Sequence, residues 1–121
     1  MTATHHHHHT DEEKGVIDEF FYVVNMPIAS LERWLDGDES KAVGQQPEAG
    51  GEWTGQRSGR RIVELLHKRR ADYDEGDIEH MRRVIAYVHH HLAQRPAGDV
   101  HDTPWRHSLM NWGHDPLTGR R

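Results

Sequence analysis

The chain has 121 residues, a hydrophobic fraction of 34%, no cysteine and a formal net charge of −5 at pH 7. This length allows one domain at most, with a core close to the smallest that folds alone. The absence of cysteine excludes disulfides and thiolate chemistry, and no apolar run is long enough to span a membrane. We therefore expect a soluble, cytoplasmic protein.

The chain is expected to hold a single helical domain over residues 15–117. Residues 1–14 are expected to form a disordered tail, and their histidine run, His5–His9, is either an expression tag or a natural feature. Residues 118–121 are expected to form a short C-terminal tail.

Two helices are expected in the first part of the domain. Apolar residues recur at helical spacing in segment 15–25, GVIDEFFYVVN, and predict a helix with this inner face: Val16, Ile17, Phe20, Phe21 and Val24. Pro27 suits the first position of a second helix, PIASLERWLDGD, which Gly37 ends. Residues 37–58 show no apolar period and hold many glycines, so we expect a long loop there.

Two more helices are expected after this loop. Segment 58–70, SGRRIVELLHKRR, predicts a third helix with Ser58 as its N-cap and with the Arg69 stem facing inward. A fourth helix follows Asp74, which is the expected N-cap, and Asp77 stands three residues later as in a capping box. The pair Arg95-Pro96 ends this helix.

The segment TPWRHSLMNWG predicts a last, short helix. Thr103 is its expected N-cap, Pro104 takes the first position, and Gly113 forms the C-terminal turn. No segment has the pattern of a strand. The predicted fold class is therefore all-α, a bundle of about five helices.

The stretch WRHSLMNWGHDPL, residues 105–117, has two interpretations. Trp105 and Trp112 can form a stacking platform for bases, with polar help from His107, His114 and Asp115. Alternatively, the Trp–Leu–Trp face covers the ends of the earlier helices as a latch. We favour the latch, because stacking platforms usually lie beside basic residues and only Arg106 is near.

The sequence predicts no catalytic, cofactor or metal site. A helical zinc pair needs two histidines on one face, typically four residues apart, whereas the consecutive residues His89, His90 and His91 point three ways around a helix. There is no cysteine nucleophile and no G-x-S-x-G motif. We therefore expect a non-enzymatic protein.

Basic residues gather where the third predicted helix begins, in TGQRSGRR. A helix N-terminus attracts anions, so cations are unfavourable there unless they bind something. Two explanations stay open: the arginines bind an external anion, or they pair with acidic segment 11–19 or with Asp36, Asp38 and Glu39. The predicted anion-binding residues are Lys41, Arg57, Ser58, Arg60, Arg61 and Lys68.

Five segments together resemble an uncharacterised bacterial family, domain of unknown function 3140: MPIASLERWL, ESKAVG, SGRRIVELLHKRRAD, HMRRVIAYVHHHLAQRP and WRHSLMNWGHDPL. The resemblance covers about residues 16–117. Members are often labelled DNA-binding proteins, and residues 27–70 resemble the helix–extended-loop–helix of SAP-type DNA-binding modules. The resemblance implies DNA binding, and the basic residues listed above predict that it uses phosphate contacts, which read little sequence. The alternative is a regulatory module that docks an acidic protein partner.

Overall fold

The computed structural model describes residues 9–47 and 53–118, and the predicted all-α class is confirmed. Within these residues there is no strand, only one isolated bridge between Pro47 and Thr54. Most of the histidine run and the last three residues of the chain lie outside the described residues. The helices are α1 (Asp11–Val23), α2 (Ile28–Leu35), α3 (Asp38–Val43), α4 (Gly55–His67), the short 3-10 helix η1 (Arg70–Asp72), α5 (Glu75–Leu92) and α6 (Pro104–Asn111).

Helix α1 begins at Asp11, inside the segment that was predicted to be a tail. The Thr10 hydroxyl accepts from the Glu13 N–H, and the Glu13 carboxylate accepts from the Thr10 N–H, which completes a capping box. The acidic first turn also suits the positive end of the helix dipole. Phe21 was expected to face inward but is 39% exposed, because the buried face runs through Ile17, Phe20 and Val23.

The predicted loop over residues 37–58 is wrong in part, because it contains α3 and the first turn of α4. Thr54, and not Ser58, is the N-cap of α4: its hydroxyl accepts from the Arg57 N–H at 3.1 Å. Ser58 consequently lies inside the helix. The helix ends at His67, so Arg69 lies beyond it with an exposed side chain, contrary to the inward position that we predicted.

The predicted caps of the last two helices are confirmed. Asp74 caps α5 and forms a capping box with Asp77. Thr103 caps α6, Pro104 is its first residue, and Gly113 adopts a left-handed φ of 82° just beyond its end.

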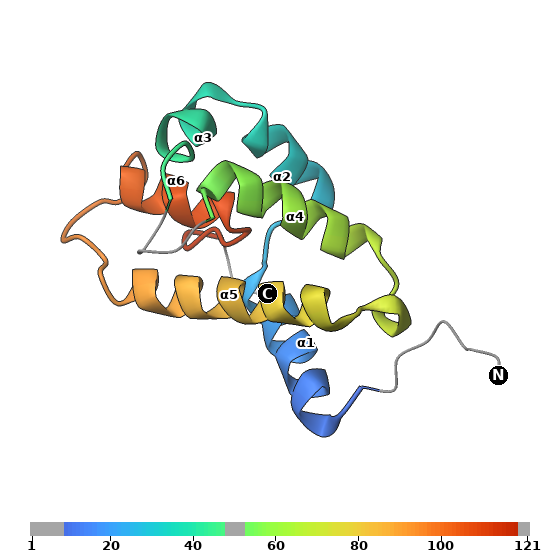
Figure 1. Cartoon of the computed structure of the whole chain (residues 1–121). Coiled ribbons are helices and arrows are strands. Elements are labelled where there is room, and N and C mark those ends of the chain that lie inside the picture. The colour runs from blue at the N-terminus through green and yellow to red at the C-terminus, as the bar shows by residue number, and fades with distance from the viewer. Residues whose placement is uncertain (1–8, 48–52, 119–121) are drawn as a thin grey trace, which may run out of the picture.

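The helices form a bundle in which α6 lies between α3 and α5 (Figure 1). Helix α1 packs on α5, α2 packs on α4, and α3 packs on α6, which also contacts α2, α4 and α5. Fully buried side chains from most of these helices meet in one core, including Ile17, Phe20, Leu31, Leu35, Ile62, Leu65, Met81, Val84, Val88 and Leu109. No helix in the described part of the chain combines the length and the apolar character that crossing a membrane requires.

Asn111 joins three helices at the centre of the bundle. It is 0% exposed, and its Oδ1 accepts from Trp34 Nε1 of α2 at 2.8 Å and from the Ser40 hydroxyl of α3. Its Nδ2 donates to the Ser40 carbonyl at 3.1 Å. From α4, Gln56 Nε2 donates to Ser40 Oγ at 2.6 Å. These bonds fix α3 against α6 and against the first turn of α4.

Candidate nucleic-acid interface

Arg57 lies in the first turn of α4, where the dipole of the helix is positive. Its guanidinium carbon lies 4.2 Å from the centroid of the Trp53 ring, a cation–π contact. Arg57 is exposed and forms no salt bridge within the described residues. Its charge is therefore stabilised by an aromatic face, and no carboxylate among residues 9–47 and 53–118 neutralises it.

Arg60 is also exposed, but it has an acidic partner. Its Nη2 lies 2.9 Å from Asp36 Oδ1 and donates to the Leu35 carbonyl at 3.3 Å. The two charged side chains are 47% and 73% exposed. Exposed ion pairs of this kind contribute about 1 kcal/mol or less, so an outside anion can replace Asp36 at small cost.

Arg61 and Lys68 share a buried carboxylate, that of Asp77. Arg61 Nη2 donates to Oδ1 at 2.8 Å, and Lys68 Nζ donates to Oδ2 at 2.6 Å. Asp77 is 1% exposed, and it also accepts from the Asp74 N–H at 3.0 Å. Burial opposes ionisation of Asp77, but the hydrogen bonds from Lys68, Asp74 and Arg61 outweigh it and lower the pKa of the carboxyl. The hydrogen bond to Asp77 correspondingly raises the pKa of Lys68.

Ser58 points into the bundle. It is 0% exposed, and its hydroxyl lies 3.0 Å from His80 Nε2 of α5 in a buried hydrogen bond. It cannot contact an external anion in this arrangement, so its prediction as a phosphate ligand is wrong. The residue positions α4 against α5 instead.

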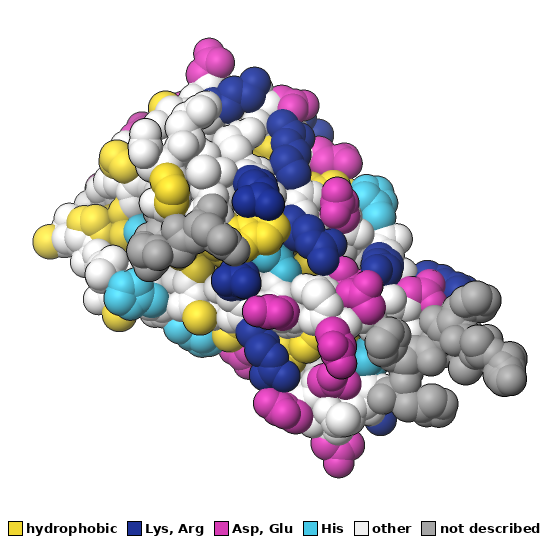
Figure 2. Space-filling view, in the orientation of Figure 1, with side chains coloured by type: hydrophobic (Ala, Val, Ile, Leu, Met, Phe, Trp, Pro, Cys, Tyr) yellow, Lys and Arg dark blue, Asp and Glu magenta, His cyan; other side chains and the backbone are white. Residues whose placement is uncertain are grey.

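Lys41 lies on α3 with an exposed side chain and no salt bridge within the described residues. Its neighbour Ser40 is fixed to Asn111 and Gln56, so the backbone that carries Lys41 has a defined position beside the start of α4. Figure 2 shows Lys and Arg side chains over α4 with acidic side chains among them, and further acidic side chains gathered over α1. The face is therefore mixed in charge and not continuously basic.

Of the predicted residues, the structure leaves Lys41, Arg57 and Arg60 accessible and commits the other three to internal contacts. Two contacts that were not predicted determine this result, that of Arg57 with the Trp53 ring and that of Arg61 and Lys68 with the Asp77 carboxylate. Asp77 was predicted only as a capping residue. It stands four residues before Met81 on the buried face of α5, and this spacing indicates that Asp77 also faces inward.

The closing stretch, residues 105–117, is a latch and not a stacking platform. Trp105 and Trp112 are 7% and 3% exposed, so neither presents a free face to bases. Arg106 holds Asp115 through two parallel bonds of 3.0 Å. Asp115 exchanges backbone–side-chain hydrogen bonds with Asn25, at the junction between α1 and α2. The stretch thus fastens the end of the domain to its beginning.

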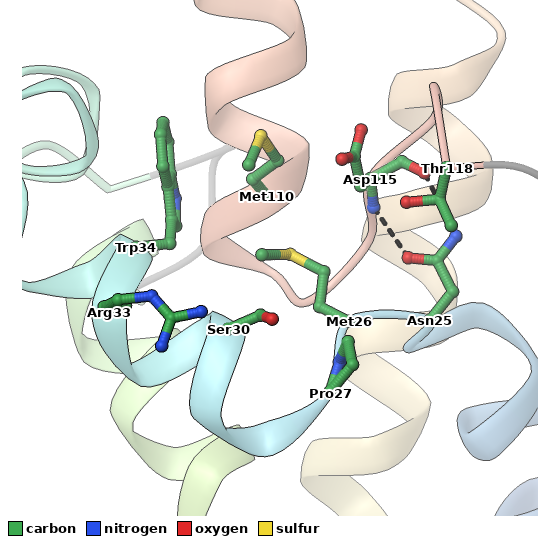
Figure 3. A pocket seen from close by; sticks show the side chains of 9 residues that line it. All are labelled: Asn25, Met26, Pro27, Ser30, Arg33, Trp34, Met110, Asp115 and Thr118. Carbon is green, nitrogen blue, oxygen red and sulfur yellow. Dashed lines mark hydrogen bonds between the residues drawn. The ribbon is translucent and has the colours of Figure 1, made fainter.

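An open pocket of about 440 Å³ lies beside this latch, between α2 and α6 (Figure 3). Its apolar side chains are Met26, Pro27, Trp34 and Met110, and the Arg33 guanidinium reaches along its edge (Figure 3). Asp115, at the other side, is already held by Arg106. The pocket contains none of the predicted anion-binding residues.

The fold and this surface define a small all-α domain with accessible cations at the start of α4. The chain belongs to the family of proteins of unknown function DUF3140, whose model matches residues 19–110. The match runs from the second half of α1 almost to the end of α6. Neither a curated protein nor a solved structure matches the chain.

Proposed function

We propose that this protein is a non-enzymatic module that binds DNA through phosphate contacts from Lys41, Arg57 and Arg60. The observation that supports the proposal is the state of Arg57. This guanidinium stands at the positive end of α4, stacks on Trp53 and lacks a carboxylate partner within the described residues. A phosphate oxygen at that position is attracted by both the side chain and the helix dipole.

The energies of the ion pairs separate the cations that can reach phosphate from those that cannot. Arg60 exchanges an exposed partner, Asp36, for phosphate at a cost of about 1 kcal/mol or less. Arg61 and Lys68 would have to leave the buried carboxylate of Asp77, and stripping a buried charge of its partners costs about 3–5 kcal/mol. These two residues therefore stay bound to Asp77.

The interface offers little sequence readout. Phosphate contacts position a protein on the duplex without reading bases. The Trp53 ring is already in contact with the Arg57 guanidinium and with the His80 ring, whose centroid is 4.4 Å away. We expect weak binding with low sequence specificity.

Fluorescence anisotropy with a labelled duplex tests the proposal. Replacing Lys41, Arg57 and Arg60 together by glutamine should weaken binding at low salt by at least about tenfold, because three counterion-releasing contacts are lost. The matched control is Arg69→Gln, which removes an exposed arginine that pairs only locally with Asp72. Equal affinity of the triple variant and the control would contradict the proposal.

An acidic protein partner is the second candidate, favoured over a duplex by the acidic side chains that lie among the cations on the same face. A polyanionic duplex is repelled by those carboxylates, whereas a protein can place its acidic groups only where the cations are. This function predicts no retention on heparin or DNA at low salt, together with co-purification of one defined protein that the triple variant no longer retains.

A further inference from the structure

Three side chains with metal-binding atoms converge where α3 meets the start of α6. These are Glu39 of α3, Asp102 of the segment before α6, and His107 of α6. One ligand atom from each lies within 4.8 Å of the others. None of the three belongs to the predicted anion-binding residues.

The caps of α6 explain why Asp102 meets His107. Thr103 is the N-cap, so Asp102 is the residue just before the cap and His107 is the fourth residue of the helix. Side chains at these two positions face each other across the cap, as in a hydrophobic staple. Here the pair is a carboxylate and an imidazole instead of two apolar groups.

The buried Asn111 network brings Glu39 to the same place. Ser40, the next residue, is held by hydrogen bonds with Asn111. Asn111 lies four residues after His107 and therefore on the same face of α6. The Trp34 ring helps to position His107: the two ring centroids are 5.2 Å apart, and Trp34 Nε1 donates to Asn111.

The protein itself leaves these ligands without strong partners. Within the described residues, no Lys or Arg forms a salt bridge with Glu39 or Asp102, and the His107 ring has no hydrogen bond. A second imidazole is near, because His101 Nδ1 lies 3.4 Å from Asp102 Oδ1. Two carboxylates side by side repel each other, and a bound cation removes that repulsion.

We propose that Glu39, Asp102 and His107 bind a divalent transition-metal ion of the Zn²⁺ class. One imidazole nitrogen and two carboxylate oxygens suit Zn²⁺, whereas Mg²⁺ and Ca²⁺ prefer oxygen ligands alone. Bonds of about 2 Å require the ligand atoms to approach more closely, and the exposed side chains of Glu39 and Asp102 can do so by rotation. The ion ties α3 to α6, with its remaining positions open to water.

The test uses the full chain with His5–His9 replaced by asparagine, so that the histidine run cannot take up metal. Competition with a chromophoric chelator should show one equivalent of Zn²⁺, not displaced by excess Mg²⁺ or Ca²⁺. His107→Gln in this background should weaken Zn²⁺ binding by at least about tenfold, the lower end of what even an outer-shell partner contributes. Glu39→Gln, at an exposed position, should weaken it as well.

The matched control is His67→Gln, which removes an exposed imidazole that also faces a carboxylate, with Nε2 3.6 Å from Glu32. It should leave Zn²⁺ binding unchanged. A second readout is the imidazole NMR spectrum, where the His107 resonances should shift on addition of Zn²⁺ and those of His67 should not. Lack of Zn²⁺ binding, or binding that survives both His107→Gln and Glu39→Gln, would overturn the proposal.

Discussion

His80 is a buried imidazole that the bundle holds in its neutral form. It is 2% exposed, and its Nδ1 has no hydrogen-bond partner within the described residues. Burial, reinforced by the positive charges of Arg61, Arg83 and Arg57, lowers the pKa of His80 to about 4. Burial also lowers the pKa values of His91 and His114, so the whole group resists protonation.

The protein should therefore lose stability as the pH falls from about 6.5 to about 4. In this window the unfolded His80 binds a proton and the folded one does not, so the free energy of unfolding decreases with falling pH. The total for His80 is about 3 kcal/mol, at about 1.4 kcal/mol per unit of pKa difference. Urea unfolding near pH 7 and near pH 5 should show about 2 kcal/mol of this total, because pH 5 lies inside the window.

His80→Gln supplies the control for this prediction, because glutamine keeps a polar partner for Ser58 and does not titrate. The variant should be less stable than the parent at neutral pH but should lose less stability on acidification. If the variant lost as much free energy of unfolding between pH 7 and pH 5 as the parent, His80 would not be the cause of the pH dependence.

Local chemistry predicts a cap residue where a neighbouring residue marks the start of the helix. Thr103 and Asp74 were predicted correctly, because each directly precedes its helix with a supporting residue nearby. At α4 two candidates compete, Thr54 and Ser58. The choice depends on His80, which lies 22 residues further along the chain and accommodates Ser58 in the core. Sequence spacing contains no information about that contact.

At the scale of elements, Gly59 sets how closely α4 approaches α2 and α6. A Cβ atom built on Gly59 would lie 2.5 Å from Leu35 Cδ2 and 2.7 Å from the Asn111 carbonyl oxygen. The second contact is with backbone, which cannot turn away. The glycine therefore allows α4 to pack directly on the segment that holds the Asn111 network.

Gly59→Ala should destabilise the protein by about 1–3 kcal/mol, the usual cost of overpacking a close contact. Gly15→Ala is the matched control: it is the same substitution within a helix, but nothing lies within 4 Å of the added Cβ. The control should stabilise the protein by about 0.5–1 kcal/mol, because glycine is a poor helix former. Thermal or urea unfolding measures both changes. If both variants were destabilised, or both stabilised, relative to the parent protein, this account of the packing would be contradicted.

Element length decides which helices the sequence reveals. The 18 residues of α5 repeat the apolar pattern often enough to predict the helix with its cap. The six residues of α3 span fewer than two turns, and the one buried residue of the helix is polar, Ser40. Its structure depends on the hydrogen bonds with Asn111, which lies 71 residues away. A pattern search in a glycine-rich segment cannot detect such a helix.

At the scale of the whole molecule, the cations and carboxylates are largely matched across helices. Arg82 pairs with Glu12 and Arg70 with Asp18, so the acidic segment of α1 is used internally by residues that lie outside the predicted site. The sequence allowed both internal pairing and external binding for the start of α4. In the tertiary structure each explanation holds for different residues: Arg61 and Lys68 pair internally, and Arg57 remains available for an external anion.

The three proposed metal ligands could be predicted from the sequence only in part. The Thr103 cap was predicted, and with it the positions of Asp102 and His107 are fixed on either side of the cap. A search for histidines four residues apart misses this pair, because the facing positions across a cap are five residues apart. The position of Glu39 could not be predicted, because α3 itself was expected to be part of a loop.

The salt dependence of DNA affinity tests the central claim, that three cations and not the whole basic cluster contact phosphate. For a duplex, log affinity against log salt has a slope of about −0.9 per contact, so Lys41, Arg57 and Arg60 predict a slope of about −2.7. If Arg61 and Lys68 also made contacts, the slope would be about −4.5. A slope near −2.7 that flattens by about one unit in Arg57→Gln supports the account; no salt dependence, or no detectable binding at low salt, contradicts it.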